Sequence, residues 1–476
     1  MELVGRHAVV LGGSIGGLLA ARVLAERYDQ VSIVERDALP LDGEHRKGVP
    51  QARHAHGLLA RGREVLEELF PGFTDDLIAR GALTGDNGVQ VRWFNNGGYH
   101  RKVPSGLRGL GVSRSLLEAR VRARVLALPN VRAIDGGDAT GFTTTGDRRR
   151  VTGVRMQRGM PGAIEESLPT DLVVDASGRG SRAPAWLEAL GYPRPAEEHV
   201  RYTTRLYRRR PEDLGGDLAI AITATPPTRR MGFILAQECD RWIVSLGGYL
   251  GEQAPTDEPG FLEFAGTLPV PDIYEVIREA EPLSEAAVYK FRSSQRRRYE
   301  RLARFPDGLL VFGDAISSFN PIYGQGMTVA ALEALALRTC LAEGPERLAS
   351  RFFQRASAVV DIPWSIAVGG DLRFPEVEGR RSPMVRFVNW YMGKLQIAAR
   401  QEAEPALAFL RVANLIAPPP SVLHPRVALR VLAGTLRTGP HAPGHPASAR
   451  RVHDGSETVG DRADQGSLPR MPNSAK

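Results

Sequence analysis

Short apolar runs separated by turn residues dominate the first 35 residues of the chain. Residues 7–11 and 31–34 are mainly apolar runs, which are typical of parallel strands buried on both faces of a sheet. The glycine-rich segment 12–17 lies between them, and the pattern from Leu18 to Arg27 predicts a helix. This order of strand, turn, helix and strand predicts the first unit of a parallel α/β sheet.

The same strand pattern returns much later in the chain, at 172–175 and 309–312. The region between them has a different pattern, in which turn residues separate four runs of strand-forming residues: 201–207, 218–225, 231–237 and 241–246. Two shorter runs, at 89–94 and 100–103, predict a β pair. These patterns predict an antiparallel sheet inserted between the segments of a parallel one.

Helices are predicted over 63–69, over 113–128 and after Gly326. The region 346–438 is predicted to be helical, with breaks at Pro363, Pro375, Pro383 and Pro418-Pro419-Pro420. Residues 439–476 contain almost no large apolar side chains, so we expect a disordered tail there.

Together these patterns predict a chain in which two folding units alternate. The parallel α/β unit takes 1–75, 107–195 and 291–345, and the inserted β-sheet unit takes 76–106 and 196–290. A C-terminal helical region over 346–438 and the tail over 439–476 complete the prediction.

Composition and charge narrow the class of protein. The chain has 476 residues, of which 42% are hydrophobic and 24% charged, which excludes wholesale disorder, a collagen-like fibre and a small disulfide scaffold. Its 62 basic residues include only 5 lysines and are mixed with acidic residues, so the net charge of +8 does not indicate nucleic acid binding. Cys239 and Cys340 lie far apart, and we see neither a signal peptide nor a membrane-spanning run. We expect a cytoplasmic protein without a metal site.

The glycine-rich turn carries the main chemical signal. Gly12-Gly13-Ser14-Ile15-Gly16-Gly17 fits the dinucleotide-binding fingerprint at Gly12 and Gly17, whereas Ser14 occupies the position of its second glycine. Such a turn presents backbone N–H groups to a pyrophosphate at the start of a helix. Glu35 follows the next strand, where a carboxylate accepts a hydrogen bond from a ribose hydroxyl. We therefore predict a dinucleotide site.

Two later segments indicate which dinucleotide. The strand 309–312 ends in Gly313-Asp314 and is followed by Gly324-Gln325-Gly326-Met327, and the strand 172–175 leads into Asp175 to Arg182. In this order the three segments resemble FAD-dependent monooxygenases. With the segments 35–40, 45–56 and 319–324, the chain is most similar to bacterial flavin epoxidases of polyether biosynthesis of the monensin and lasalocid type, and more loosely to squalene epoxidase.

The resemblance implies the fold of p-hydroxybenzoate hydroxylase: a Rossmann-like α/β domain that binds FAD, an inserted antiparallel β-sheet domain and C-terminal helices. It also implies the residues that hold FAD. For the ADP half these are Gly12, Gly13, Ser14, Gly16, Gly17, Glu35 and Arg36. Toward the phosphates or ribityl chain they are Arg46 and Arg114, and Asp175 is a further cofactor-binding residue. At the ribityl chain and flavin ring they are Asp314, Pro321, Gly324, Gly326 and Met327.

The implied activity is monooxygenation in secondary-metabolite or antibiotic biosynthesis, in which a C4a-hydroperoxyflavin epoxidises an alkene of a polyketide or isoprenoid intermediate. The flavin itself carries the chemistry, so no catalytic side chain is required. Candidates for an apolar substrate pocket are the aromatic residues Phe94, Tyr202, Phe233, Trp242, Phe319 and Tyr323. We find no second nucleotide-binding turn, so NAD(P)H either binds transiently or reduces the flavin through a separate flavin reductase.

Several alternatives remain open at this stage. The related reaction is hydroxylation of an activated aromatic ring; dehydrogenation, saturation of a prenyl chain and FAD binding without turnover are others. Within 384–416 a stripe of apolar residues either packs on the FAD domain or lies on a membrane surface, the first being the expected arrangement; it consists of Val385, Val388, Trp390, Tyr391, Leu395 and Ile397. The oligomeric state is not predicted.

Overall fold

A five-stranded parallel sheet forms the centre of the structure, which is a computed structural model that describes residues 2–40, 46, 48–159, 164–192, 201–289, 294–319, 323–377 and 379–437. Its strand order is β18-β11-β1-β2-β7. The strands are β1 (Gly5–Leu11), β2 (Tyr28–Val34), β7 (Val131–Ile134), β11 (Leu172–Asp175) and β18 (Leu309–Val311). This sheet therefore joins segments some 300 positions apart; four of its strands lie at the predicted runs, whereas β7 was not predicted.

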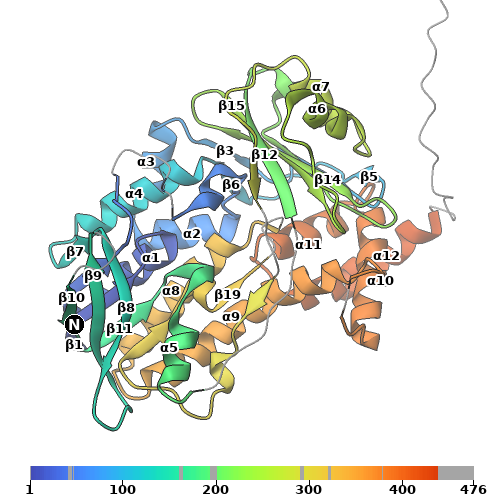
Figure 1. Ribbon diagram of the computed structural model, residues 1–476. Helices are drawn as coiled ribbons and strands as arrows, with labels where there is room; N and C mark the ends of the chain where they lie inside the picture. The colour runs from blue at the N-terminus through green and yellow to red at the C-terminus, as the bar shows by residue number, and fades with distance from the viewer. Residues whose placement is uncertain are drawn as a thin grey trace, which may run out of the picture. The chain divides into compact units, whose positions relative to one another are not determined.

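Helices cover one face of this sheet (Figure 1). A small antiparallel sheet also packs on the parallel sheet, with its strand β9 near β11 and its strand β8 near β2. The helices are α1 (Ile15–Leu24), α2 (Ala60–Leu69), α3 (Phe73–Ala79), α4 (Arg114–Leu126), α8 (Gly326–Ala342) and α9 (Leu348–Asp371). The small sheet consists of β8 (Gly137–Thr144), β9 (Val151–Arg158) and β10 (Glu165–Pro169), and α5 (Ala183–Ala189) follows β11. The parallel strands are buried from both sides, which explains their continuous apolar sequences.

The predicted inserted sheet has seven strands in the order β16-β12-β15-β14-β13-β4-β5. They are β4 (Val91–Asn95), β5 (Gly98–Tyr99), β12 (Arg201–Arg208), β13 (Ala219–Ile222), β14 (Arg230–Gln237), β15 (Arg241–Gly248) and β16 (Ala287–Tyr289). All pairs are antiparallel except β4 with β13. The prediction of a strand at 100–103 is wrong, because Asn96 and Gly97 adopt positive φ and turn the chain back earlier, into β5.

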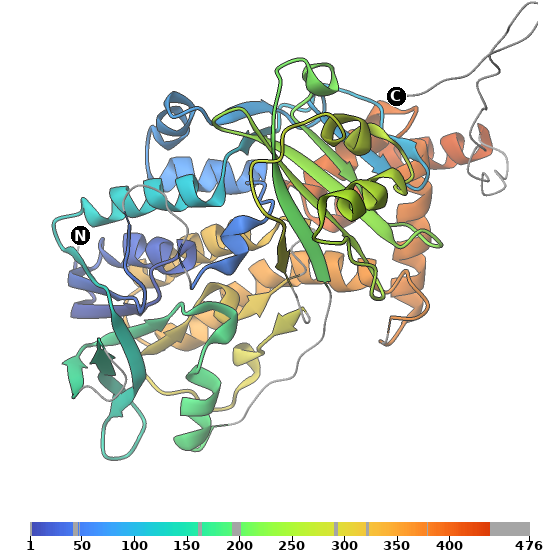
Figure 2. The same cartoon turned by 45° about the horizontal axis from the view of Figure 1, so that its top comes forward.

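Two helices cover one face of the seven-stranded sheet: α6 (Glu258–Gly266) and α7 (Asp272–Ile277) (Figure 2). Two further two-stranded sheets pair β3 (Leu83–Asp86) with β6 (Arg108–Gly111) and β17 (Gln295–Arg296) with β19 (Ser317–Ser318). The first of these sheets is followed at once by α4, whose N-terminus is capped by the Ser113 hydroxyl.

The C-terminal part is helical, as predicted. It contains α10 (Pro383–Ala398), α11 (Ala403–Ala413) and α12 (Pro425–Arg437), which pack on one another and on β4 through Trp93 and Phe409. The break predicted at Pro363 does not occur: α9 continues through it, since a proline removes only one helical hydrogen bond and Phe352 and Val360 anchor the helix in the core.

The predicted fold class is confirmed: a parallel α/β sheet, an inserted and mainly antiparallel sheet, and C-terminal helices. Met1–Arg437 form one compact unit, and the domain boundaries that we drew inside it stay predictions. The predicted tail, 439–476, lies outside the described residues. No helix in the described part of the chain is long and apolar enough to cross a membrane.

Candidate functional site

The turn between β1 and α1 requires glycine at two positions. Gly12 has φ +105°, and a Cβ atom there would lie 2.6 Å from the Ala176 carbonyl oxygen. A Cβ atom on Gly17 would lie 1.8 Å from the Gly12 carbonyl oxygen. Both contacts are with backbone, which has no room to move away. The turn therefore keeps its backbone at the surface of the cavity described below, where a phosphate group can approach.

Glu35 fixes the other side of this turn. One carboxylate oxygen accepts a hydrogen bond from Gly13 N at 2.7 Å, and the other accepts one from Asp37 N at 3.1 Å. The Arg46 guanidinium lies 3.3 Å from the same carboxylate. Since Glu35 also lines the cavity, its remaining lone pairs are available to a hydroxyl of a ligand.

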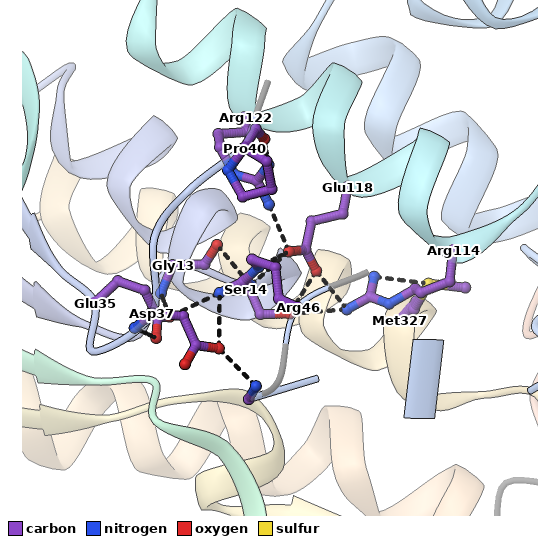
Figure 3. Close-up of polar contacts among 11 residues, drawn as sticks. Gly13, Ser14, Glu35, Asp37, Pro40, Arg46, Arg114, Glu118, Arg122 and Met327 are labelled. Carbon is purple, nitrogen blue, oxygen red and sulfur yellow. Dashed lines mark hydrogen bonds and ion pairs between the residues drawn. The ribbon is translucent and has the colours of Figure 1, made fainter. Parts of the chain in front are cut away.

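A buried cluster of charges lies beneath the turn (Figure 3). At its centre is Glu118 of α4, which sequence analysis did not select. One Glu118 oxygen accepts hydrogen bonds from Arg46 at 2.5 Å and Arg122 at 2.7 Å; the other accepts one from the Ser14 hydroxyl at 2.7 Å and lies 3.3 Å from Arg114. Glu118 is only 4% exposed, so three arginines share one almost fully buried carboxylate.

The electrostatics of this cluster keep Glu118 ionised. Burial opposes ionisation, but the charges of Arg114 and Arg46 and the hydrogen bonds from Ser14 and Arg46 outweigh it, so the pKa of Glu118 lies below its ordinary value. Arg114 also donates to Ser14 Oγ at 3.0 Å and to Met327 Sδ at 3.2 Å. Ser14 and Arg114 both line the cavity, and α1 begins beside them with its positive dipole end, an arrangement that favours an anion.

Asp175 shapes the second segment without lining the cavity. Its Oδ1 accepts hydrogen bonds from the backbone N–H and the hydroxyl of Ser177 at 3.0 and 2.5 Å, and its Oδ2 accepts one from the Ser181 hydroxyl at 2.5 Å. These bonds hold the turn after β11, and it is Ser177–Gly180 of this turn that line the cavity. Asp175 is fully buried, and its hydrogen bonds hold the turn that lines the cavity.

The third segment follows β18. The Asp314 carboxylate lines the cavity and is accessible from it, and desolvation by the surrounding protein raises its pKa above the ordinary value. Gly324, with φ +63°, and the first turn of α8 at Gly326 and Met327 line the cavity beside it. Behind Asp314, burial raises the pKa of Glu333 to about 8, so this carboxyl is mostly neutral at pH 7. Pro321 lies outside the described residues.

The three segments meet at one cavity of about 500 Å³. Ten of the predicted cofactor residues line it: Gly12, Ser14, Gly16, Glu35, Arg36, Arg114, Asp314, Gly324, Gly326 and Met327. Gly13, Gly17, Arg46 and Asp175 do not; they lie behind the lining residues and hold them. The lining includes four arginines and three carboxylates, and with the backbone N–H groups of the turns these suit a dinucleotide that has a pyrophosphate and hydroxyls, such as FAD.

Sequence analysis missed part of the lining. His56 and Gly57 lie near Gly324, and Asp138, Arg182 and Trp186 line another part of the cavity. His56 Nδ1 lies 2.8 Å from the His54 carbonyl oxygen, so Nδ1 carries the proton and Nε2 is left as an acceptor. Burial, together with Arg114, lowers the pKa of His56 to about 4. His56 belongs to the run 45–56, which carries part of the family resemblance, but the sequence alone gave no role for this histidine.

The predicted aromatic residues lie at different places. Phe94 and Trp242 pack against α6 and α7, on the face of the sheet opposite Ala55, so their prediction as substrate-pocket residues is wrong. Alternate residues of a strand point to opposite faces, and the sequence did not reveal which face the two helices cover. Phe233 lies on the face that contacts Ala55, and Phe319 lines the cavity.

The two remaining aromatic residues are tyrosines. Tyr202 is on β12, where its backbone pairs with Gly247. Tyr323 immediately precedes Gly324, and its hydroxyl donates to Asp371 Oδ1 at 3.0 Å, an oxygen that also accepts from Tyr249 at 2.8 Å. Tyr323 therefore ties the segment that ends at Gly324 to α9.

No family model matches the chain. A protein of Mycobacterium tuberculosis, Protein Rv3254, is 34% identical over 431 residues, which cover 86% of this chain and 90% of the relative. The chain belongs to the family of Protein Rv3254. The 6-methylpretetramide 4-monooxygenase of Streptomyces rimosus is 25% identical over 368 residues, which cover 73% of this chain and 78% of that enzyme.

Solved structures support the fold of this member of the Rv3254 family. PqsL of Pseudomonas aeruginosa, described as a probable FAD-dependent monooxygenase, matches with a TM-score of 0.59 at 16% identity, over 78% of this chain and 98% of PqsL. The p-nitrophenol 4-monooxygenase PnpA of Pseudomonas putida matches with a TM-score of 0.59 at 16% identity, over 87% of this chain and 98% of PnpA. The chain thus has the fold of FAD-dependent monooxygenases of the p-hydroxybenzoate hydroxylase type.

Proposed function

We propose that this protein is an FAD-dependent monooxygenase that epoxidises an alkene in an apolar polyketide or isoprenoid intermediate. The observation that carries the proposal is the meeting of Gly12–Gly16, Ser177–Gly180 and the segment from Gly324 to Met327 at one cavity. The fold and the names of the 6-methylpretetramide and p-nitrophenol monooxygenases support the class of reaction.

The residues of the chain would hold FAD by complementary charge. Ser14, the N-cap residue of α1, and Arg114, the first residue of α4, suit the pyrophosphate, while Glu35 and Asp314 would accept hydrogen bonds from hydroxyl groups of the ribose and the ribityl chain. Backbone N–H groups at Gly326 and Met327 face the cavity at the start of α8 and suit the flavin ring. When bound, FAD supplies the chemistry that activates O₂.

The rest of the chain's task is to position the alkene and exclude water. Phe319 offers an apolar wall in the cavity, and the sheet face that includes Phe233, Leu206 and Ile243 lies next to Ala55, which also lines it. In the overall reaction alkene, O₂, NAD(P)H and a proton give epoxide, water and NAD(P)⁺. One oxygen atom forms two C–O bonds in place of the π bond, and the other leaves as water.

Hydroxylation of an aromatic ring is the second candidate, because the structural neighbour PnpA is named as a monooxygenase of p-nitrophenol, a phenol. Phenol hydroxylation benefits from a base that takes the phenolic proton. His56 lines the cavity and its Nε2 is an acceptor, so it is the histidine to consider for that role, and the substrate assay below decides between the two reactions.

A paired substrate assay tests the proposal. The protein with FAD, NAD(P)H and a flavin reductase is incubated in air with a conjugated polyene and, separately, with a phenol, and product masses are recorded with ¹⁸O₂. Epoxidation predicts one labelled oxygen atom in the polyene product and little product from the phenol. Product from the phenol alone would replace epoxidation by hydroxylation, and no labelled product with a wide panel of either class would overturn monooxygenation.

A further inference from the structure

An apolar stripe on α10 is only half covered. Met384, Val388, Tyr391, Leu395 and Ala398 recur at alternating spacings of four and three residues, so they lie along one side of the helix. Tyr391, Leu395 and Ala398 are buried in a cluster with residues of α11 and α12. Met384 continues the same stripe but is 67% exposed, and Val388 is also exposed. The apolar side of α10 thus extends beyond the part that α11 and α12 cover.

Other large apolar side chains of α10 and α12 are exposed. Phe387 and Trp390 of α10 are exposed, Trp390 by 56%, and α12 contributes exposed Leu429 and Leu432. The two helices are packed together, as Gly434 against Ala398 shows, and both views place them side by side (Figures 1 and 2). Of the 14 exposed large hydrophobic residues in the described part of the chain, 8 fall between 384 and 432, so this concentration is local.

We call the exposed residues Met384, Phe387, Val388, Trp390, Leu429 and Leu432 the α10–α12 face. It differs from the stripe considered from sequence, because Tyr391 and Leu395 of that stripe are buried between the helices.

Positive charge is concentrated in the same region. Residues 379–437 contain nine arginines and lysines and two glutamates, a net charge of +7, out of +8 for the whole chain. Helices α10 and α12 themselves contain five basic residues and no acidic one: Arg386, Lys394, Arg426, Arg430 and Arg437. Elsewhere in the chain, basic and acidic residues nearly balance.

This charge indicates which kind of binding partner the α10–α12 face favours. A second copy of the chain would bring a region of +7 against another of +7, which disfavours a symmetric dimer through this face. A bilayer with anionic lipids attracts the basic residues and accepts exposed Trp, Phe, Met and Leu side chains at the depth of its headgroups. We propose that the α10–α12 face binds the surface of an anionic lipid membrane. The proposal rests on these helices alone and does not depend on the proposed function.

Vesicle binding tests this proposal with the full-length protein. Flotation is measured with vesicles of phosphatidylcholine alone and of phosphatidylcholine with a quarter of phosphatidylglycerol, at low and high salt. We expect binding to the anionic vesicles at least tenfold stronger than to the neutral ones, and loss of most of it in high salt. Equal binding to both vesicles, or none to either, would overturn the proposal.

Variants of the α10–α12 face test whether this face is the part of the protein that binds vesicles. The double variant Phe387→Ser with Trp390→Ser is expected to lose anionic-vesicle binding at least tenfold, and Arg386→Glu with Lys394→Glu to lose it similarly. Ile78→Ser is the matched control, since Ile78 is an exposed apolar residue on α3, outside this face. Circular dichroism and FAD binding check that each variant is folded. Unchanged vesicle binding in both double variants would overturn the proposal. So would a dimer of the wild type that Phe387→Ser with Trp390→Ser converts to a monomer.

Discussion

Glu118 provides the sharpest test of the buried cluster beneath the glycine turn. Glu118→Gln keeps the shape of the side chain and removes its charge, so Arg46, Arg114 and Arg122 lose the carboxylate that they share. Removing one partner of a buried ion pair costs about 3–5 kcal/mol, because the remaining charge stays buried without compensation. We expect the free energy of unfolding to fall by about that amount.

The assay is urea unfolding at pH 7 without added FAD, followed by tryptophan fluorescence. Glu343→Gln is the matched control: Glu343 also pairs with two arginines, Arg351 at 2.7 Å and Arg355 at 2.6 Å, but at the surface. Water and salt screen surface pairs of this kind, so they contribute little and the control should lose little stability.

A double-mutant cycle separates the charge effect from a general disturbance of packing. Arg122 does not line the cavity and lies 2.7 Å from Glu118. Glu118→Gln combined with Arg122→Gln should therefore lose less stability than the sum of the two single variants, by about 1–3 kcal/mol. If Glu118→Gln costs no more than Glu343→Gln, or if the two effects in the cycle simply add, the reasoning about this cluster is refuted.

Three further predictions concern the turn, the histidines and the segment before Gly324. Gly17→Ala, whose Cβ would overlap a backbone oxygen at 1.8 Å, should weaken FAD binding at least tenfold in a fluorescence titration, whereas Gly393→Ala, in open space on α10, should not. Burial lowers the pKa of His54 to about 3 and of His100 to about 4. As the pH falls, each of these histidines is protonated in the unfolded chain before it is protonated in the folded protein. The free energy of unfolding is therefore highest above about pH 6.5 and should fall by about 2 kcal/mol per histidine at pH 5. Urea unfolding that is unchanged between pH 8 and pH 5 would contradict this. Tyr323→Phe removes a hydrogen bond worth about 1 kcal/mol and should weaken FAD binding about fivefold without unfolding the protein, and an unchanged dissociation constant would argue against its role.

The parts of the site that sequence predicted are those with a local pattern. Gly12, Gly17 and Glu35 lie within one strand–turn–helix–strand unit, where the steric need for glycine and the position at a strand end can be recognised in neighbouring residues. Asp314 follows the end of an apolar run, and its role was implied by the resemblance of this segment to FAD-dependent monooxygenases. In each case the backbone that holds the residue is defined by the residues next to it.

Contacts between distant segments could not be predicted in this way. Glu118 meets Arg46, 72 positions away, and nothing in the helical sequence around Glu118 distinguishes it from a surface glutamate. Trp242 was placed at the substrate for a related reason: strand alternation gives two faces, but only the packing of α6 identifies the covered one.

The central claim of this account is that three distant segments form one FAD site, and the flavin content of the purified protein tests it most directly. The visible absorbance spectrum and a titration of the protein with FAD, followed by flavin fluorescence, are measured together with circular dichroism. The account predicts one FAD bound per chain, with binding strongly weakened in Gly17→Ala. A folded, colourless protein that binds no added FAD would contradict it.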